Sequence, residues 1–216
     1  MDQFKKWLDN YWYHYKWMTI IILFFTIALS VCLVQCSQKD EYDMYALYAG
    51  PCHIGGSEAT QLRDAINDFM EADKQNVCLN NFVYVSSSKK DEYKEGDAYV
   101  NEGINMQQTS DFFDFLYTAS FNMLIVDSEL YSLIRKDEIL TPISEISEIM
   151  TDSSSDGYSV RLYDTTLPDK YSIFAKMPED TLLCFRKNVL MQNLASNKSV
   201  QFYEYQKSIF KKIIEQ

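Results

Sequence analysis

The segment that most constrains this chain is an uncharged run near its beginning, WMTIIILFFTIALSVCLVQCSQ, over residues 17–38. Residues 17–34 are almost wholly apolar. A helix rises about 1.5 Å per residue, so roughly 20 apolar residues cross the ~30 Å hydrocarbon layer of a bilayer. The sequence therefore predicts a single transmembrane helix at this position.

The residues that flank the run predict its orientation. Lys5, Lys6 and Lys16 precede it, and the segment KDEYD that follows is mainly acidic. Aromatic rings in YWYHYKW, residues 11–17, are typical of the headgroup boundary. Because cytoplasmic flanks carry the lysine and arginine excess, we expect a single-pass protein of the cell membrane with a cytoplasmic N-terminus. The expected parts are a cytoplasmic segment (1–16), a transmembrane helix (17–36), a linker (37–43) and an extracellular domain (44–216).

Two processing signals are alternatives to a permanent anchor. A cleaved signal peptide has an apolar core of about 7 to 15 residues and an A-x-A-like site, whereas this run is longer and lacks that site. A lipoprotein site would use LVQC, which ends at Cys36, but Gln35 stands where a small residue is expected. We therefore favour a signal anchor that is not cleaved.

Charge and cysteine content exclude several classes of partner and cofactor. The formal net charge is −11, and the acidic excess lies beyond residue 36. An acidic domain repels nucleic acid and anionic lipid, so neither is an expected partner. Cys52, Cys78 and Cys184 form an odd set outside the membrane, which is consistent with one Cys52–Cys78 disulfide or with none. No pair has metal-ligand spacing and His53 is the only histidine there, so no metal and no cofactor are predicted.

Short apolar runs alternate with helical periodicity along the outer segment. Strands are expected over residues 44–49, 81–85, 122–127, 158–164, 171–177 and 180–186. Helices are expected from a cap at Ser57 to Met70, from Phe112 to Ala119, around Leu130 to Ile134, and from Phe202 to Ile214. Strands that alternate with helices predict an α/β fold with a mainly parallel sheet, and the last three strands suggest an antiparallel edge.

One stretch resembles a known family. The sequence DFFDFLYTASFNMLIVDSELYSLIRKDEILTPISEI, residues 111–146, is similar to the part of type 2 extracellular solute-binding proteins where a helix leads to a strand ending in Asp. In that family a short helix and a G-x-L-x-P-L turn follow. Here Glu138, Leu140, Pro142 and Ile143 hold that turn, with Glu in place of Gly.

Residues 171–188 resemble the family segment that crosses between two lobes, and the chain as a whole looks like uncharacterised single-pass clostridial surface proteins. The resemblance implies one compact lobe like that of a periplasmic binding protein. About 180 residues make little more than one lobe, so closure of two lobes over a ligand is not implied.

A glycine-containing turn, YAGPCHIGGSEA, follows the first expected strand. Gly50 and Gly55 occupy the two glycine positions of a P-loop and Ser57 its final hydroxyl, but Gly56 replaces the lysine that reaches the phosphates. ATP hydrolysis is therefore not expected. A plain turn with a serine cap is the simplest interpretation, and contact of backbone N–H groups with an anionic or polar group is the functional one.

Ligands of open α/β sheets bind at the carboxyl ends of the parallel strands. That edge holds the glycine turn and the Asp127 that ends a later strand. The candidate ligand-binding residues are therefore Gly50, His53, Gly55, Gly56, Ser57 and Asp127.

Two further patterns favour a structural interpretation. In TDSSSDG, Asp152, Ser154, Asp156 and Gly157 match the start of a calcium loop, but Tyr163 stands where the bidentate glutamate belongs. A solvated loop is expected, with a weak calcium site as the alternative.

Cys52 lies beside His53, yet catalytic thiol and imidazole pairs usually meet across the fold. G-x-S-x-G and H-E-x-x-H are absent from the sequence. No enzyme is predicted.

Two functions are consistent with these sequence features. The first is a non-catalytic, membrane-anchored binding or accessory module that holds a small polar ligand or peptide. The second is a structural subunit of a larger membrane complex with no small ligand. A binding module needs a concave pocket with convergent polar groups, whereas a docking subunit shows an exposed apolar patch or a transmembrane face of small residues.

Overall fold

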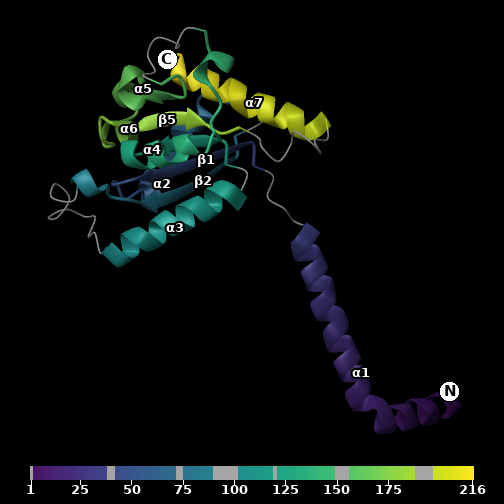
Figure 1. Ribbon diagram of the computed structural model, residues 1–216. Coiled ribbons are helices and arrows are strands. Elements are labelled where there is room, and N and C mark those ends of the chain that lie inside the picture. Colours follow the sequence, from purple (N-terminus) through teal and green to yellow (C-terminus); the bar gives the residue numbers. More distant parts are fainter. Residues whose placement is uncertain are drawn as a thin grey trace. The chain divides into compact units, whose positions relative to one another are not determined.

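The computed structural model describes residues 2–37, 42–71, 75–89, 102–118, 121–148, 156–187 and 197–216. The chain divides into two compact units, residues 1–41 and residues 42–216 (Figure 1). Most of the calcium-like segment, residues 151–155, lies outside the described residues, as do residues 90–101.

The first unit is one helix, α1 (Asp2–Ser37), which begins well before the expected boundary at residue 17. Its residues Tyr11–Cys32 are apolar and long enough to cross a membrane. The hydroxyls of Thr19, Thr26 and Ser30 donate to the carbonyl four residues earlier, at 2.8–3.0 Å. Polar groups within the apolar part are thus satisfied inside the helix, as a hydrocarbon environment requires.

The second unit is an α/β domain around a five-stranded mixed sheet. The strands are β1 (Met44–Gly50), β2 (Val77–Val83), β3 (Met123–Val126), β4 (Ser159–Arg161) and β5 (Leu182–Phe185). Their spatial order is β2-β1-β3-β5-β4. β1 pairs with β2 and β3 in parallel, and β5 pairs with β3 and β4 antiparallel. The expected α/β class with a mixed sheet is confirmed.

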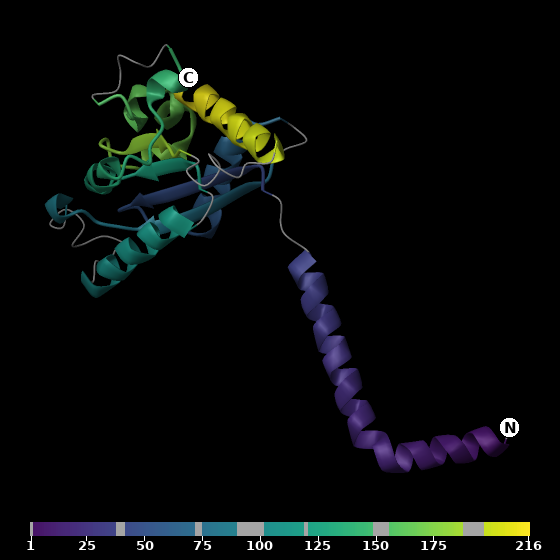
Figure 2. The ribbon, with the colours of Figure 1, turned by 45° about the vertical axis from the view of Figure 1, so that its right-hand side comes forward.

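Helices cover both faces of this sheet. They are α2 (Gly56–Asn67), α3 (Glu102–Thr118), α4 (Ser128–Lys136), α5 (Leu167–Lys170), α6 (Ser172–Ala175) and α7 (Asn197–Ile214). Among the described residues, 3-10 turns span η1 (Ser87–Lys89), η2 (Ile143–Glu145) and η4 (Leu162–Asp164). α3 and α7 lie on opposite sides of the sheet in both views (Figures 1 and 2).

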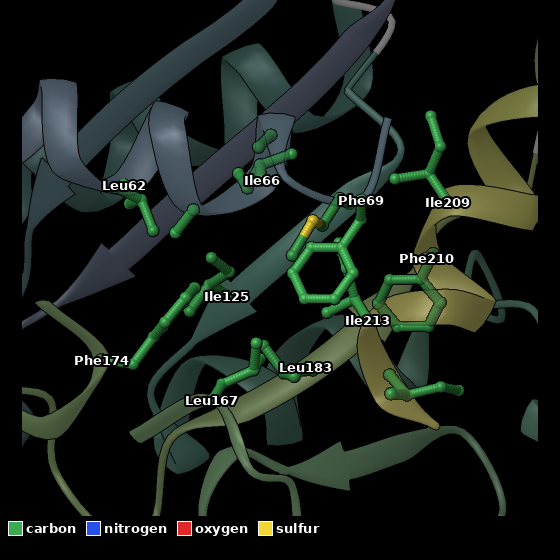
Figure 3. Packing of buried hydrophobic residues seen from close by; sticks show 14 of the residues in the cluster. Leu62, Ile66, Phe69, Ile125, Leu167, Phe174, Leu183, Ile209, Phe210 and Ile213 are labelled. Atoms are coloured by element: carbon green, nitrogen blue, oxygen red, sulfur yellow. The ribbon is translucent and has the colours of Figure 1, made fainter. Parts of the chain in front are cut away.

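Two buried clusters correspond to the two faces. On one face, side chains of α2, α5, α6 and α7 pack on the sheet, with Leu62, Phe174 and Phe210 among them (Figure 3). On the other face, Phe112 of α3 and Leu130 of α4 pack on alternate residues of the same strands. β1 and β3 are therefore buried on both sides, which explains why their sequences, MYALYAG and MLIV, are continuous apolar runs.

Several local predictions are wrong. α3 begins at Glu102, ten residues before the expected start, and the expected strand 158–164 divides into β4 and a 3-10 turn, Leu162–Asp164. The expected strand 171–177 contains the short helix α6 instead, because Ile173, Phe174 and Met177 recur at helical spacing and all face the core. β2 begins four residues before the expected strand 81–85, since polar Asn80 and Asn81 lie within it. Ser57 does not cap α2; Gly55 does, and its N–H donates to Glu58 Oε2 at 3.3 Å.

One non-glycine residue among those described has a left-handed backbone: Glu138, with φ of 56°. It lies in the turn after α4, where Thr141 N–H donates to Phe185 O and joins the chain to the end of β5. A side chain in this conformation costs roughly 1–2 kcal/mol, which glycine avoids.

We therefore expect Glu138→Gly to raise the free energy of unfolding by about 1 kcal/mol. The matched control is Lys136→Gly, two residues earlier in the last turn of α4, which should lower it by about 1 kcal/mol. Thermal denaturation of the full chain in detergent micelles measures both. Equal loss of stability in the two variants would contradict the assigned backbone.

Candidate functional site

The candidate site lies where β1, β2 and β3 end. The connection from β1 runs outward to β2, and the connection from β2 returns past β1 to β3, so the direction of the chain across the sheet reverses beside β1. In open α/β sheets this reversal creates the usual ligand crevice, at the carboxyl ends of the strands. Three segments meet there: the glycine turn after Gly50, the segment from Tyr84 to Lys89, and Asp127 at the start of α4.

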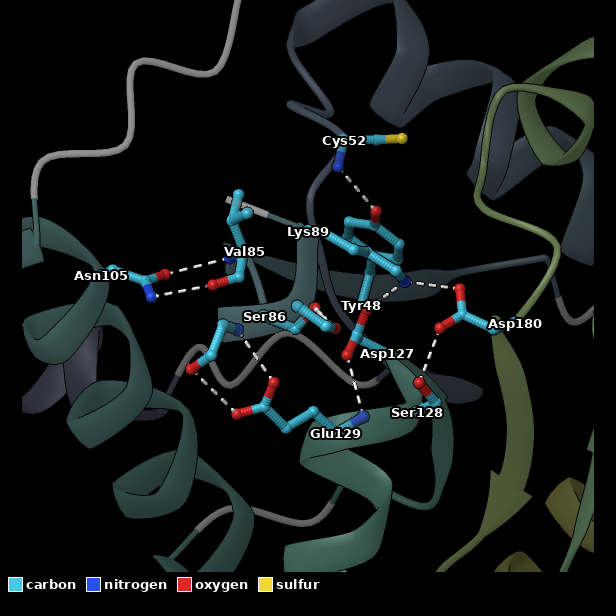
Figure 4. Close-up of polar contacts among 12 residues, drawn as sticks. Tyr48, Cys52, Val85, Ser86, Lys89, Asn105, Asp127, Ser128, Glu129 and Asp180 are labelled. Carbon is cyan, nitrogen blue, oxygen red and sulfur yellow. Dashed lines mark hydrogen bonds and ion pairs between the residues drawn. The ribbon is translucent and has the colours of Figure 1, made fainter. Parts of the chain in front are cut away.

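A buried ion pair occupies this edge (Figure 4). The Asp127 side chain is 0% exposed, and Lys89 Nζ lies 2.7 Å from its Oδ2. The same ammonium lies 2.5 Å from Asp180 Oδ1, and Ser128 donates its hydroxyl to Asp180 Oδ2 at 2.6 Å. Asp127 Oδ1 also accepts the Glu129 N–H at 2.9 Å and so caps α4. A charge so deeply buried is stable only with partners of this kind.

These contacts shift two pKa values. Burial acts to lower the pKa of Lys89, but its bonds to Asp127 and Asp180 outweigh that effect and raise it. Burial acts to raise the pKa of Asp180, but its bonds to Lys89 and Ser128 outweigh that effect and lower it. Both groups are therefore held in their charged forms.

The spacing of Ser86 and Lys89 matches S-x-x-K, a serine-enzyme motif whose absence was wrongly assumed in the prediction of no enzyme. In serine enzymes with this motif the hydroxyl needs a base that can take its proton. Here Lys89 is paired with two carboxylates and its pKa is raised, and Ser86 Oγ lies 3.2 Å from Ser88 Oγ. The arrangement is that of a structural ion pair and not of an activated nucleophile.

The glycine turn is organised by the Tyr48 hydroxyl. Cys52 N–H donates to Tyr48 Oη at 3.0 Å. A Cβ on Gly50 would lie 2.6 Å from that oxygen, so glycine is required there by close approach. The Cys52 thiol donates to Lys176 O at 3.1 Å, and its burial raises its pKa. Cys52 and Cys78 are both free thiols.

The positive end of α2 already has an anionic partner within the chain. Glu58 accepts the Gly55 N–H and also pairs with Lys176 Nζ at 2.7 Å. The hydrogen bond from Lys176 is the largest cause of the lowered pKa of Glu58. Ser57 is exposed, and a Cβ at Gly56 would meet nothing within 4 Å.

The structure brings the six predicted site residues to one edge. Gly50, His53 and the Gly55–Ser57 segment share one turn, and Asp127 N–H donates to Ala49 O at 2.9 Å, which places Asp127 beside them. Sequence reasoning missed Lys89 and Asp180. The S-x-x-K spacing was an available signal for Lys89, whereas Asp180 carried none because it reaches this edge only through the fold.

Within the described residues, no group of three or more His, Cys, Asp or Glu side chains could hold a metal ion. Asp156, from the calcium-like segment, accepts a hydrogen bond from Tyr131 and pairs with Arg135 at 3.2 Å. Gly157 beside it has φ of 78°.

Two hollows lined by described residues lie away from the strand ends. The larger, about 440 Å³, lies between α2 and β2. It is lined by Tyr42, Thr60, Arg63, Asp64, Asn67 and residues 75–80. The smaller, about 270 Å³, lies between α2 and the α5–α6 segment and includes Asp68, Lys170 and Tyr171. The larger hollow offers the polar, concave surface expected of a binding site.

Comparisons with protein-family models, with curated proteins and with solved structures find no match to this chain.

We expect the Lys89–Asp127 ion pair to make a larger contribution to the free energy of unfolding than the exposed ion pairs do. Replacing Lys89 by alanine leaves the buried Asp127 carboxylate without its cation, so we expect a loss of about 3–5 kcal/mol in unfolding free energy. Lys176→Ala is the matched control, since it removes an exposed lysine from an exposed pair and should leave the melting temperature nearly unchanged. Chemical denaturation in detergent micelles distinguishes the two, and equal effects would contradict the assigned importance of Lys89.

The same contacts predict a pH dependence. Because the folded pKa of Asp180 is lowered, its contribution is present above about pH 4 and is lost as the pH falls through the folded value. Because the folded pKa of Lys89 is raised, its contribution is present below about pH 10 and is lost as the pH rises through the folded value. Asp180→Asn should flatten the acid decline in stability, measured by denaturation between pH 3 and 7. An unchanged slope would show that Asp180 is not linked to folding.

Proposed function

We propose that the protein is a membrane-anchored, non-catalytic binding or accessory module whose extracellular α/β domain corresponds to one lobe of a solute-binding protein. The observation that carries this proposal is the polar hollow of about 440 Å³ between α2 and β2, in a domain that follows a single apolar helix. A hollow with amide, hydroxyl and charged side chains suits a small polar ligand or a peptide.

The absence of catalysis is supported by the chemistry of the strand ends. Lys89 is held charged between Asp127 and Asp180, and the Cys52 thiol donates to a carbonyl with its pKa raised. Nucleophilic catalysis needs an activated group with a base or a lowered pKa. The described groups at this edge are arranged for stability instead.

The likeness to solute-binding proteins is supported by the order of elements. α3, β3, Asp127 and α4 follow one another as the resemblance implies. Glu138, which stands where the family motif has glycine, has the positive φ that glycine favours. The likeness therefore extends to backbone conformation at one motif position.

The alternative, a subunit that docks without a small ligand, has weaker support. Large exposed apolar side chains occur on α3 at Met106, Phe115 and Tyr117. At 100° per residue, Phe115 points to the side opposite Met106, whereas Met106 and Tyr117 lie within about 20° of each other but about three turns apart. These three side chains thus form no contiguous apolar stripe of the kind a docking face shows.

A thermal-shift screen tests the proposal. The full chain in detergent micelles is heated with sugars, amino acids, peptides, nucleotides and Ca²⁺, and a ligand at 100 times its Kd should stabilise the domain by about 2.7 kcal/mol. A rise with any polar compound supports a binding module. A well-folded domain with no response across the panel contradicts it and favours the docking subunit.

Two variants locate a ligand found in this way. Gly56→Val fills open space at the glycine turn, and Arg63→Ala changes the wall of the hollow. If only Gly56→Val abolishes the ligand-induced thermal shift, the ligand binds at the glycine turn. If only Arg63→Ala abolishes it, the ligand binds in the hollow.

A further inference from the structure

β2 is an edge strand, paired only with β1. Its backbone groups alternate between the two sides of the strand. Asn76 O accepts the Met44 N–H and Tyr84 N–H donates to Gly50 O, so the even-numbered residues face β1. Val77, Leu79, Asn81 and Val83 therefore turn their N–H and C=O groups outward, and no hydrogen bond from another described residue to these groups is found.

One side chain of this protein already bonds to backbone groups next to this outward-facing row. At Val85, the next odd-numbered residue, the Asn105 side chain donates Nδ2–H to Val85 O and accepts the Val85 N–H at Oδ1, both at 3.0 Å (Figure 4). An amide in this position makes the same pair of bonds as a neighbouring strand. Asn105 thus continues the ladder at one end of the row that β2 leaves open.

The edge also lacks the usual protection against strand pairing. Natural edge strands carry lysine, proline or bulges that prevent further pairing. β2 reads VCLNNFV, without charge or proline, and its register with β1 is regular over seven residues. Such an edge is suited to accept another strand.

The larger hollow lies directly against this edge. Residues 77–80 of β2 form one wall, and Thr60, Arg63, Asp64 and Asn67 of α2 form the other. A strand laid beside β2 would direct every second side chain towards this wall, where the exposed carboxylate of Asp64 can accept hydrogen bonds.

We propose that β2 binds an extended segment of a partner protein, which adds a sixth strand to the sheet and places donor side chains in the hollow. This is β-augmentation, in which backbone bonds supply affinity and side-chain pockets supply specificity. It rests on the proposed function and identifies its ligand as a peptide. The chain has a net charge of −11, so the segment is uncharged or basic. The same charge disfavours a second copy of the chain at this edge.

The test uses the full chain in detergent micelles and a displayed library of random octapeptides. Peptides that bind are assayed by residue-resolved amide hydrogen exchange. Without peptide, the outward N–H groups of Leu79 and Asn81 should exchange faster than those of Cys78 and Asn80, which bond to β1. With peptide, exchange at Leu79 and Asn81 should slow at least tenfold.

A matched pair of variants tests the backbone contact. Val77→Pro removes one outward N–H at the first residue of the strand, where proline is tolerated, and Val77→Ala shortens the side chain but keeps that N–H. Peptide affinity should fall at least tenfold in Val77→Pro relative to Val77→Ala. If Val77→Pro does not fold, the exchange measurement on the unaltered chain still decides.

Several results would overturn the inference. Peptides that bind without slowing Leu79 and Asn81, or small ligands that bind when no peptide does, overturn it but leave the binding module intact. Slow exchange at these residues in a dimeric chain without peptide shows that a second copy occupies the edge. If no library peptide binds and no compound of the ligand panel shifts the melting temperature, the inference and the proposed function are both overturned.

Discussion

The α/β domain depends on how it neutralises one buried carboxylate. Asp127 directly follows β3 at the point where the parallel strands stop, and its side chain is wholly buried. It caps α4 with one oxygen and binds Lys89 with the other. Lys89 in turn holds Asp180, which precedes β5, so one ammonium joins three segments that are distant in the sequence. The carboxyl edge of the sheet is therefore stabilised by its own charges.

This internal pairing bears on where the proposed ligand would bind. In an open α/β sheet the strand ends usually receive the ligand, yet here Asp127, Glu58 and the Tyr48 hydroxyl already have partners within the chain. A ligand at that edge would have to displace these contacts. The polar hollow beside β2 requires no such exchange. The proposed binding surface therefore lies along the open side of the sheet and not at its end.

Several features followed directly from local sequence patterns. β1 and β3 were predicted closely, because residues buried on two faces form continuous apolar runs. The C-terminal end of α7 was also predicted, because a helix packed on one face repeats its apolar residues every three or four positions, although α7 begins five residues before the expected Phe202. The same rules failed for residues 171–177, where a short apolar run suits a strand or a helix equally, and packing of Phe174 against the core decided for the helix. The start of β2 was missed because Asn80 and Asn81 interrupt its apolar pattern; the Asn81 amide bonds to Ile54 O.

The sequence by itself determined an apolar helix long enough to span a membrane, an acidic α/β domain after it, and the glycine turn with Asp127 at the strand ends. These are local properties, since length, charge and periodicity are read within a few turns of chain. Only the tertiary structure decided that Lys89 and Asp180 meet Asp127, that Glu58 occupies the positive end of α2, and that β2 lies at the edge of the sheet with a hollow beside it. Such features depend on which segments become neighbours, and strand order arises from the packing of the whole domain.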